Sequence, residues 1–312
     1  MKTQLFINNK NIYKANLHCH TTVSDGKLSP QEIKEAYKAK GYSIIAFTDH
    51  DNLVNQSHLN DDNFLAISSC EVGLSAPEEF GQRGKNKCYH LNLYSLDPNA
   101  SQTPPLMQMD YFDIDAINQY IKDRNDEGYL VCYNHPYWSL QTYEDYSPLK
   151  GCFAMEIYNN GCEVSDGYFG YNPQVYDEML RQDNKLFCLS TDDNHNGHPD
   201  GTLSDSFGGF VMINCDSLDY SSVMDALVQG DFYSSQEPEI FEISMEDGTL
   251  NIKCSDVNLI VVYTDGRKCY VKKGESINEA SFELKGDEKY IRVMCRDKDH
   301  KDANSNAYWI ES

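Results

Sequence analysis

The sequence lacks any long apolar run. None of its 312 residues belongs to a stretch of roughly 18 consecutive apolar residues, which is the length that a membrane-spanning helix needs. The first residues, MKTQLFINNKN, hold no apolar segment of the secretory type. We therefore expect a protein without a signal peptide or a membrane span, located in the cytoplasm.

Positive charge is scarce. Lysine and arginine number 26 against 49 aspartates and glutamates, so the formal net charge is -23. A surface of this sign repels nucleic-acid backbones, and we expect no nucleic-acid polymer as a partner. A small anionic substrate is not excluded, because bound metal ions can invert the potential inside a site.

Paired cysteine motifs are also missing. The eleven cysteines are an odd number, and they are scattered mostly through apolar, strand-like segments such as those around Cys132 and Cys188. Without CxxC spacing or the density of a small disulfide-rich domain, they are interpreted as reduced core residues of a cytosolic protein.

Up to about residue 235, predicted strands alternate with predicted helices. Ser29-Pro30-Gln31-Glu32 is a capping box with proline at the first helical position, and Gly41 ends the helix that follows. This order predicts βαβ units and a parallel sheet. The predicted strands lie near LHCH, 43–47, 64–69, 89–93, 129–133, 153–158, 185–190 and 210–214, and the other helices near 111–127, 173–183 and 219–229.

Beyond about residue 235 the helical spacing ends. Short alternating segments such as EIFEISM, LIVVY and YIRVMCR are separated by turn pairs such as Asp247-Gly248. This pattern is typical of a small β-sandwich. We expect two domains, 1–235 and 236–312, with a boundary near Pro238.

Metal-binding residue types follow or interrupt the predicted strands. His18 and His20 point to the same side of an extended segment because they are two residues apart, and TDHD follows another strand at 48–51. The carboxyl ends of strands in a parallel α/β barrel meet at one face, so these side chains should converge. The set is His18, His20, Asp25, His50, Glu71, His90, His135, Asp193 and His195.

Histidines and carboxylates without cysteine suit Zn, Mn or Fe. Nine such residues are enough for two or three divalent ions that share a bridging carboxylate. Closely spaced ions activate a bridging water, and they bind the attacking and leaving oxygens of a displacement reaction. The expected chemistry is hydrolysis, most naturally of a phosphoester, by a metal-bound hydroxide with no side-chain nucleophile.

At this point the sequence resembles the PHP family, named for polymerase and histidinol phosphatase domains. The resemblance covers about residues 1–235 and rests on HCHTTVSDG, TDHD, Glu71, His90, NHP at 134–136 and DDNH at 192–195. It implies a distorted (β/α)7 barrel with a trinuclear metal site. The SDG segment with Asp25 is similar to the small phosphoesterases and nucleotide phosphatases of the family.

The resemblance also implies which residues share each ion. The first metal would be held by His18, His20, Glu71 and Asp193; the second by Glu71, His90 and His135; the third by Asp25, His50 and His195. Three further residues, Asp49, Asp192 and Glu156, are expected to hold these ligands in place from behind.

Residues that bind the substrate are harder to predict. Family nucleotide phosphatases often carry an arginine after the His-Pro motif, whereas here Tyr137 and Trp138 follow. A phosphate clamp could come from the loop that contains Arg83, Lys85 and Lys87, and the alternative is a solvated charged turn. Tyr137 and Trp138 could stack on a planar group or serve as rim aromatics. His198 is a further candidate for substrate contact.

Three functions remain open. The first is a metal-dependent phosphoesterase for a small phosphorylated metabolite or nucleotide. The second is a hydrolase of a non-phosphate ester, carbamate or amide with the same metals. The third is a non-catalytic, metal-stabilised binding module, which a complete ligand set disfavours. An oligonucleotide nuclease is disfavoured by the negative charge.

Overall fold

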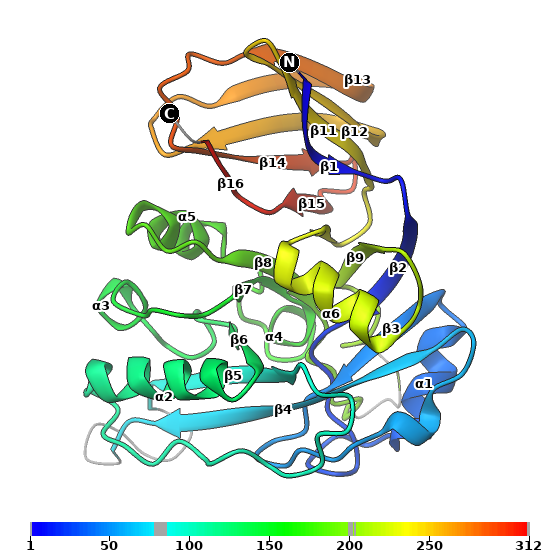
Figure 1. Ribbon diagram of the computed structural model, residues 1–312, viewed down its shortest axis with the longest axis vertical. Coiled ribbons are helices and arrows are strands. Elements are labelled where there is room, and N and C mark those ends of the chain that lie inside the picture. Colours follow the sequence, from blue (N-terminus) through cyan, green and yellow to red (C-terminus); the bar gives the residue numbers. More distant parts are fainter. Residues whose placement is uncertain (1, 78–85, 199–201, 203, 311–312) are drawn as a thin grey trace.

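The chain combines a mixed α/β region with a C-terminal region of strands (Figure 1). The computed structural model describes residues 2–77, 86–198, 202 and 204–310. Among these, every named helix precedes Ser235, and every named element that begins after it is a strand. The predicted fold class, an α/β region followed by a β-rich region, is confirmed.

Eight strands form the sheet that carries the candidate site. Their hydrogen-bonded order is β9-β2-β3-β4-β5-β6-β7-β8. The far end returns toward the start, because the backbone N–H of Ser190 in β8 donates to Ser234 Oγ in β10 (Phe232–Ser235) at 3.0 Å. The sheet therefore curls into a barrel. The bounds are β2 Asn11–Asn16, β3 Tyr42–Phe47, β4 Leu65–Ser75, β5 Cys88–Ser95, β6 Tyr129–Tyr133, β7 Ala154–Asn159, β8 Phe187–Thr191 and β9 Phe210–Cys215.

The prediction of a parallel sheet is wrong for β5 and β9. The pairs β2-β3, β3-β4, β6-β7 and β7-β8 are parallel, but β5 runs antiparallel to both β4 and β6, and β9 runs antiparallel to β2. Antiparallel neighbours can be joined directly, without the crossover helix that parallel neighbours need. The sequence between β4 and β5 contains no helical pattern, which fits this arrangement.

The four predicted helices are present. They are α1 Pro30–Lys38, α2 Ile114–Asp126, α5 Pro173–Arg181 and α6 Tyr220–Gln229. The capping box of α1 is formed, since Ser29 Oγ accepts from the Glu32 N–H at 3.3 Å and the Ser29 N–H donates to Glu32 Oε2 at 2.8 Å. Three short elements were not predicted: α3 Tyr143–Tyr146, α4 Asn160–Val164 and the 3₁₀ turn η1 Ser57–Leu59.

Alternate residues of the strands face the barrel interior, and their character changes along each strand. In β4, Leu65 and Ile67 pack in a buried apolar cluster with Leu227 of α6. Two and four residues beyond Ile67, on the same face, come Ser69 and Glu71. The apolar half of the interior stabilises the barrel, and the polar half forms the candidate site.

The C-terminal strands are longer and fewer than predicted. Pairs of predicted short strands are merged into β12 and β13, and β15 was not predicted. N-terminal β1 (Lys2–Ile7) pairs with β11, so the first strand belongs to this sheet and not to the barrel. The bounds are β11 Ile240–Glu246, β12 Thr249–Thr264, β13 Tyr270–Glu283, β14 Tyr290–Arg296, β15 Asp302–Ser305 and β16 Tyr308–Trp309.

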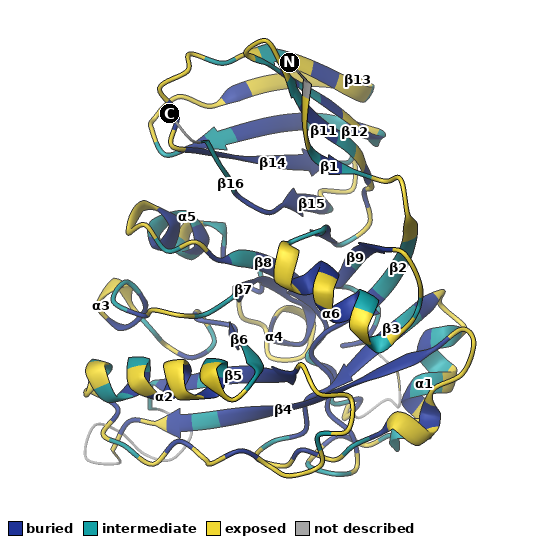
Figure 2. Ribbon diagram, viewed as in Figure 1, coloured by how far each residue is buried: buried dark blue, intermediate teal, exposed yellow. Residues whose placement is uncertain are grey.

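The two regions are tightly joined. Strand β15 pairs with β10, and Arg292 of β14, 1% exposed, forms a bidentate ion pair with Asp177 of α5 at 2.6 and 2.8 Å. Figure 2 shows β14 and β15 as largely buried strands. Burial of this kind holds α5 and the segment before it in a fixed position.

All eleven cysteines are free thiols, and nine of them are buried. The interpretation as core residues holds for these nine, whereas Cys152 is partly exposed and Cys269 is exposed. Among the described residues, no helix is long and apolar enough to cross a membrane.

Candidate metal centre

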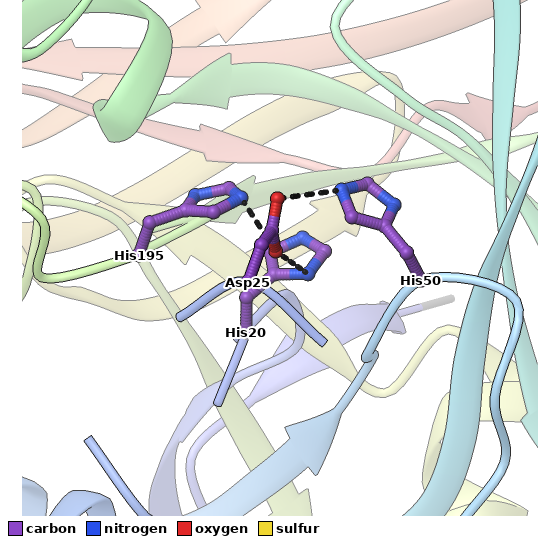
Figure 3. A group of neighbouring side chains, drawn as sticks. All are labelled: His20, Asp25, His50 and His195. Carbon is purple, nitrogen blue, oxygen red and sulfur yellow. Dashed lines mark ion pairs between the residues drawn. The ribbon is translucent and has the colours of Figure 1, made fainter. Parts of the chain in front are cut away.

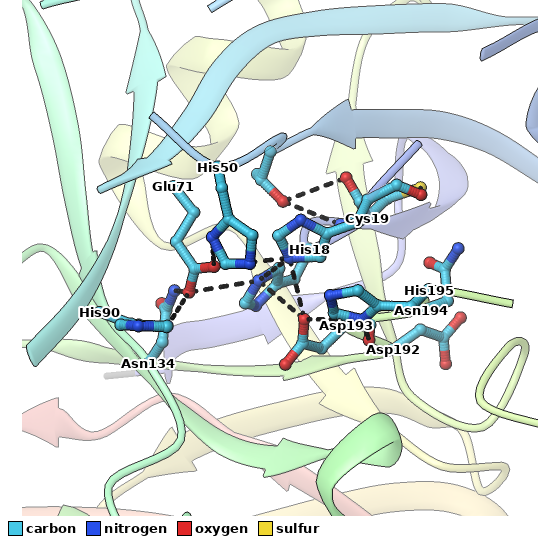
Figure 4. A network of polar contacts seen from close by, with 12 residues as sticks. His18, Cys19, His50, Glu71, His90, Asn134, Asp192, Asp193, Asn194 and His195 are labelled. Atoms are coloured by element: carbon cyan, nitrogen blue, oxygen red, sulfur yellow. Dashed lines mark hydrogen bonds and ion pairs between the residues drawn. The ribbon is translucent and has the colours of Figure 1, made fainter. Parts of the chain in front are cut away.

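Glu71 lies at the centre of the ligand-type residues. Its Oε1 is 3.1 Å from His90 Nδ1, 3.3 Å from His135 Nε2 and 3.4 Å from His18 Nε2. Its Oε2 is 3.1 Å from His50 Nδ1 and 3.4 Å from His20 Nε2. Five imidazoles from different parts of the chain thus surround one buried carboxylate. Figure 4 shows three of them, those of His18, His50 and His90, beside Glu71.

Two of these residues lie within strands and not after them. Glu71 is inside β4 and His90 inside β5, directly on the pair of antiparallel strands. The placement of Glu71 just beyond a strand was therefore wrong, because β4 continues to Ser75. Both side chains still reach the site, since they face the barrel interior.

A first group consists of His18, His20 and Asp193. The two Nε2 atoms are 3.1 Å apart, and Asp193 Oδ1 lies 3.1 Å from His18 Nε2 and 3.0 Å from His20 Nε2. For bonds of about 2.1 Å to one ion, neighbouring ligand atoms are about 3.0 Å apart in an octahedron and about 3.4 Å in a tetrahedron. The observed distances, including those to Glu71, match this spacing.

A second group joins Glu71 and His135 to His18. His90 faces the same Glu71 oxygen as His135, and His135 Nε2 is 3.8 Å from Asp193 Oδ2. Glu71 Oε1 thus lies between the first group and the pair His90 and His135. This is the arrangement in which one carboxylate can bridge two ions.

A third group contains Asp25, His50 and His195, and His20 as well (Figure 3). Asp25 Oδ1 is 3.4 Å from His195 Nε2, and Asp25 Oδ2 is 3.7 Å from His50 Nε2. His20 Nδ1 lies 3.8 Å from Asp25 Oδ1. The resemblance assigned His20 to the first ion, whereas its ring lies between the first and third groups.

The residues fit divalent metal ions. Among the described residues, three buried atoms at the centre make no hydrogen bond: His20 Nδ1, Glu71 Oε2 and His90 Nδ1. Each lies close to other ligand atoms without hydrogen-bond geometry, as expected for atoms that point toward a common ion. Imidazole and carboxylate ligands suit Zn, Mn and Fe, and these three groups form a candidate metal site.

Glu156 holds two ligands from behind. Its Oε1 is 2.6 Å from His18 Nδ1, and its Oε2 accepts the His135 backbone N–H at 3.0 Å. A proton on His18 Nδ1 leaves Nε2 free for a metal, which is the usual role of a carboxylate behind a histidine ligand. Thr191 Oγ1 and Asn159 Nδ2 also donate to Glu156, at 2.7 and 2.9 Å.

Asp49 and Asp192 support loops and not ligand side chains. Asp49 accepts from the backbone and hydroxyl groups of Thr21 and Ser24, in the turn just before Asp25. Asp192 accepts from Tyr37 Oη at 2.7 Å and from the backbone N–H groups of residues 207–209 at 2.7–2.9 Å. Each therefore shapes the backbone beside the ligands.

Two glycines allow the ligand segments to approach closely. A Cβ at Gly26 of the SDG segment would lie 2.5 Å from the carbonyl oxygen of His20, and a Cβ at Gly161 would lie 2.7 Å from the carbonyl oxygen of Asp193. The backbone at Asp193 itself has a positive φ of 52°, which aspartate tolerates better than most residues. Larger residues at these glycines would displace ligands.

Burial and neighbouring charges shift the pKa values of the ligands in opposite directions. Burial works against protonation of His18 and His90, but neighbouring groups outweigh it and raise the pKa of both histidines well above the ordinary value. These groups are the carboxylates of Asp193, Glu156 and Glu71 for His18, and chiefly the carboxylate of Glu71 for His90. Burial likewise opposes the charge of Glu71, yet the surrounding histidines lower its pKa well below the ordinary value. The pKa of His195 is raised to about 9, against burial, chiefly by its interaction with Asp25.

Metal binding is therefore expected to release protons. At pH 7 the metal-free protein should carry protons on His18, His90 and His195, and coordination requires neutral nitrogens. Since these pKa values are raised, metal affinity should increase with pH, and it should increase through about pH 9, where His195 loses its proton. Calorimetric titration with Zn²⁺ in two buffers of different ionisation enthalpy measures the protons released at pH 7 and pH 9.5. Equal proton release at both pH values would contradict this account.

The metal groups open into a cavity of about 440 Å³. Beyond the ligands, its walls are formed by Trp138, Gly161, Ser165, Asp166, Gly197, His198 and Asp205. The Trp138 ring contacts His90 and His135, with centroids 5.6 and 5.0 Å apart, and its Nε1 donates to Asp166 Oδ2 at 2.7 Å. His198, a predicted substrate contact, lies in this wall.

The other predicted substrate contacts are placed differently. Tyr137 is 48% exposed and packs against Tyr168 and Phe169 outside the cavity, so Trp138 is the aromatic residue that faces the metal groups. Arg83 and Lys85 lie outside the described residues. Lys87 is paired with Asp145, its Nζ 2.5 Å from Oδ2.

Several site residues were missed in the sequence. Asn134 Nδ2 donates to Glu71 Oε1 at 2.7 Å, and Asn159 Nδ2 donates to Asp193 Oδ2 at 3.0 Å. Asn134 belongs to the NHP segment and Asn159 ends β7, so their positions at strand ends were a signal. Asp166 and Asp205 lie in loops without a recognisable pattern and could not be found in this way.

Comparisons with known proteins identify the family of the chain. The PHP domain model matches residues 16–227. A 5'-3' exoribonuclease of Haemophilus influenzae is 28% identical over 95 residues, which is 30% of this chain and 33% of that protein, so the chain aligns with about a third of the curated relative.

Two solved structures are similar at low identity. One is a two-domain protein from Bacteroides vulgatus described as containing a predicted PHP-like metal-dependent phosphoesterase, with 16% identity, 99% and 97% of the two chains covered and a TM-score of 0.49. The other is an amidohydrolase from Chromobacterium violaceum with bound sulfate, with 13% identity, 58% and 87% covered and a TM-score of 0.36. Since the family model spans more than half of the residues and its ligand motifs converge on one site, the chain belongs to the PHP domain family, and its site is that of a metal-dependent hydrolase.

Proposed function

We propose that this protein is a metal-dependent phosphoesterase that hydrolyses a small phosphorylated metabolite or nucleotide. One observation carries the proposal: the Glu71 carboxylate lies within 3.4 Å of five histidine nitrogens, at the spacing of ligands around shared ions. Two or three divalent ions would be held by the three groups. Bound ions of this kind lower the pKa of a water molecule and stabilise charge on phosphoryl oxygens.

The chain's own residues then have a limited set of tasks. Glu156 and Asn159 keep the histidine and aspartate ligands in place, and Asn134 orients Glu71. Trp138 closes one wall of the cavity and excludes water from that side. None of these tasks requires a side chain that attacks phosphorus.

The charges of the cavity walls and of the whole protein support a small substrate with one anionic end. Among the described residues that line the cavity, none is lysine or arginine. Bound metal ions would neutralise a phosphate group in this cavity. A polymer such as the substrate of an exoribonuclease would place further phosphates against an acidic surface, since the net charge is -23.

The same ligands could serve hydrolysis of a carboxylic ester, carbamate or amide, and an activity screen separates the two reactions. Protein stripped with a chelator and reloaded with Zn²⁺, Mn²⁺ or Fe²⁺ is tested on p-nitrophenyl phosphate, p-nitrophenyl acetate and an anilide. We expect metal-dependent release of nitrophenol from the phosphate ester. Metal-dependent turnover of the acetate or anilide alone would replace the proposal with the alternative.

A further inference from the structure

Asp205 is a buried carboxylate that none of the three metal groups includes, although it lines the same cavity. We propose that Asp205 accepts a hydrogen bond from a hydroxyl group of the substrate, which makes the substrate a phosphate ester of a hydroxyl-rich alcohol. The inference rests on the proposed phosphoesterase function and names the substrate class of that site.

The two oxygens of Asp205 have different surroundings. Oδ2 accepts the backbone N–H groups of His195 and Asn196, at 2.9 and 2.8 Å. Oδ1 is buried and makes no hydrogen bond with any described residue. The side chain is only 3% exposed. A buried acceptor without a donor costs free energy, so the geometry calls for a donor, and the cavity that Asp205 lines is a side from which a donor can come.

The donor must come from a group that carries hydrogen. A hydroxyl or an N–H group of the substrate can donate to a carboxylate, whereas an ionised phosphate, a carbonyl oxygen or an ionised carboxylate cannot. An anionic group at this position would also be repelled by Asp166 and Asp205, and no lysine or arginine lies among the described lining residues to offset this repulsion. A neutral hydroxyl satisfies Oδ1, and it is the donor that the proposal assigns to the substrate.

The wall of the cavity formed by Trp138 is aromatic, in contrast to the acidic wall that contains Asp205. The indole is held by its hydrogen bond to Asp166 and by contacts with His90 and His135. A flat, partly apolar ring fits against such a surface. A ring that also bears hydroxyl groups is found in two sources, sugar phosphates and ribonucleoside phosphates, and both share the chemistry inferred here.

The Asp205→Asn variant tests the role of Oδ1 separately from that of Oδ2. An asparagine keeps one oxygen, which can accept the His195 and Asn196 N–H groups as Oδ2 does, and it places an NH₂ donor where Oδ1 accepts. The turn that carries His195 should therefore be retained while the Oδ1 acceptor is lost. Asp205→Ala removes both functions, and Asp62→Asn makes the same chemical change at an exposed position.

Each protein, reloaded with metal, is assayed with glucose 6-phosphate, with a ribonucleoside 5'-monophosphate and its 2',3'-dideoxy analogue, and with p-nitrophenyl phosphate, which has no hydroxyl. For Asp205→Asn we expect KM for the hydroxyl-bearing ester to increase at least about tenfold more than KM for p-nitrophenyl phosphate. Asp62→Asn should leave this ratio as in the wild type. A wild-type preference for glucose 6-phosphate, or for the ribonucleotide over its dideoxy analogue, identifies the source.

A second measurement does not depend on hydrolysis. Saturation-transfer NMR with free glucose and with the free ribonucleoside should show binding of one of them to the wild type and weaker binding to Asp205→Asn. An equal increase of KM for all esters, no change in KM, or unchanged binding of both free compounds would overturn the inference. If the wild type hydrolyses no phosphate ester, the proposed function fails, and the NMR comparison alone decides the role of Asp205.

Discussion

Replacing Glu71 with glutamine is expected to reduce hydrolysis of phosphate esters by at least about 10³-fold, more than the roughly 10- to 100-fold that loss of a residue behind the ligands costs. The reason is the position of this carboxylate, which has both oxygens within 3.4 Å of histidine nitrogens from all three groups. A glutamine keeps the shape but contributes one oxygen and no charge. Its NH₂ group would face nitrogens that must remain free for metal ions.

Metal content separates this effect from misfolding. Elemental analysis of purified Glu71→Gln protein should give at least one ion fewer per chain than the wild type, with an unchanged circular dichroism spectrum. Glu144→Gln, the same change at an exposed position of α3, should behave as the wild type. A Glu71→Gln protein with full metal content and more than a tenth of wild-type activity would refute the shared-carboxylate model.

Replacing Glu156 with glutamine is expected to weaken metal binding by roughly 10- to 100-fold and to reduce activity by a similar factor. Glu156 is fully buried and is not among the described residues that line the cavity beside the metal groups, yet it accepts from His18 Nδ1 and from the His135 backbone N–H. A glutamine can accept only through one oxygen. Its NH₂ group would meet either His18 Nδ1–H or the His135 N–H, and such an unsatisfied buried donor costs about 1–3 kcal/mol.

Competition titration with a chromogenic chelator measures the affinity directly. The expected loss should come with a lower thermal unfolding temperature in the metal-free form, because the buried mismatch is present without metal. Glu144→Gln again serves as the matched control. Wild-type metal affinity in Glu156→Gln would mean that Glu156 contributes only to folding, and His18 would then need another partner to set its tautomer.

Local chemistry made part of this protein predictable. The capping box at Ser29, the proline at the start of α1 and the glycine after α6 act within a few residues, so their effect can be recognised without knowing the fold. The HxH pair and TDHD were also recognisable, because the two-residue spacing brings side chains to one side of an extended segment. These features predicted the α/β region, the family and the kind of metal chemistry.

Long-range pairing decided what local patterns could not. The antiparallel direction of β5, the place of β1 in the C-terminal sheet and the merged strands β12 and β13 depend on partners far away along the chain. A strand pattern indicates which residues share one face of a strand, but it does not indicate which other strand pairs with that strand. For this reason the sequence predicted that Glu71 and His90 belong to the site but placed Glu71 beyond the end of its strand.

Most residues of the cavity wall could not be identified from the sequence in this way. From the sequence alone, Tyr137 was the aromatic residue predicted to contact the substrate, with Trp138 adjacent to it, and Asp205 is one of many loop aspartates. Only the closed barrel turns Trp138 toward His90 and His135 and leaves Tyr137 outside. Only the fold buries Asp205 with one oxygen that has no hydrogen-bond partner among the described residues. The sequence by itself determined the family and the ligand types, because these depend on residue identity and short spacing. The tertiary structure decided how the groups share Glu71 and what the cavity can recognise, because burial and side-chain direction arise only when distant segments pack together.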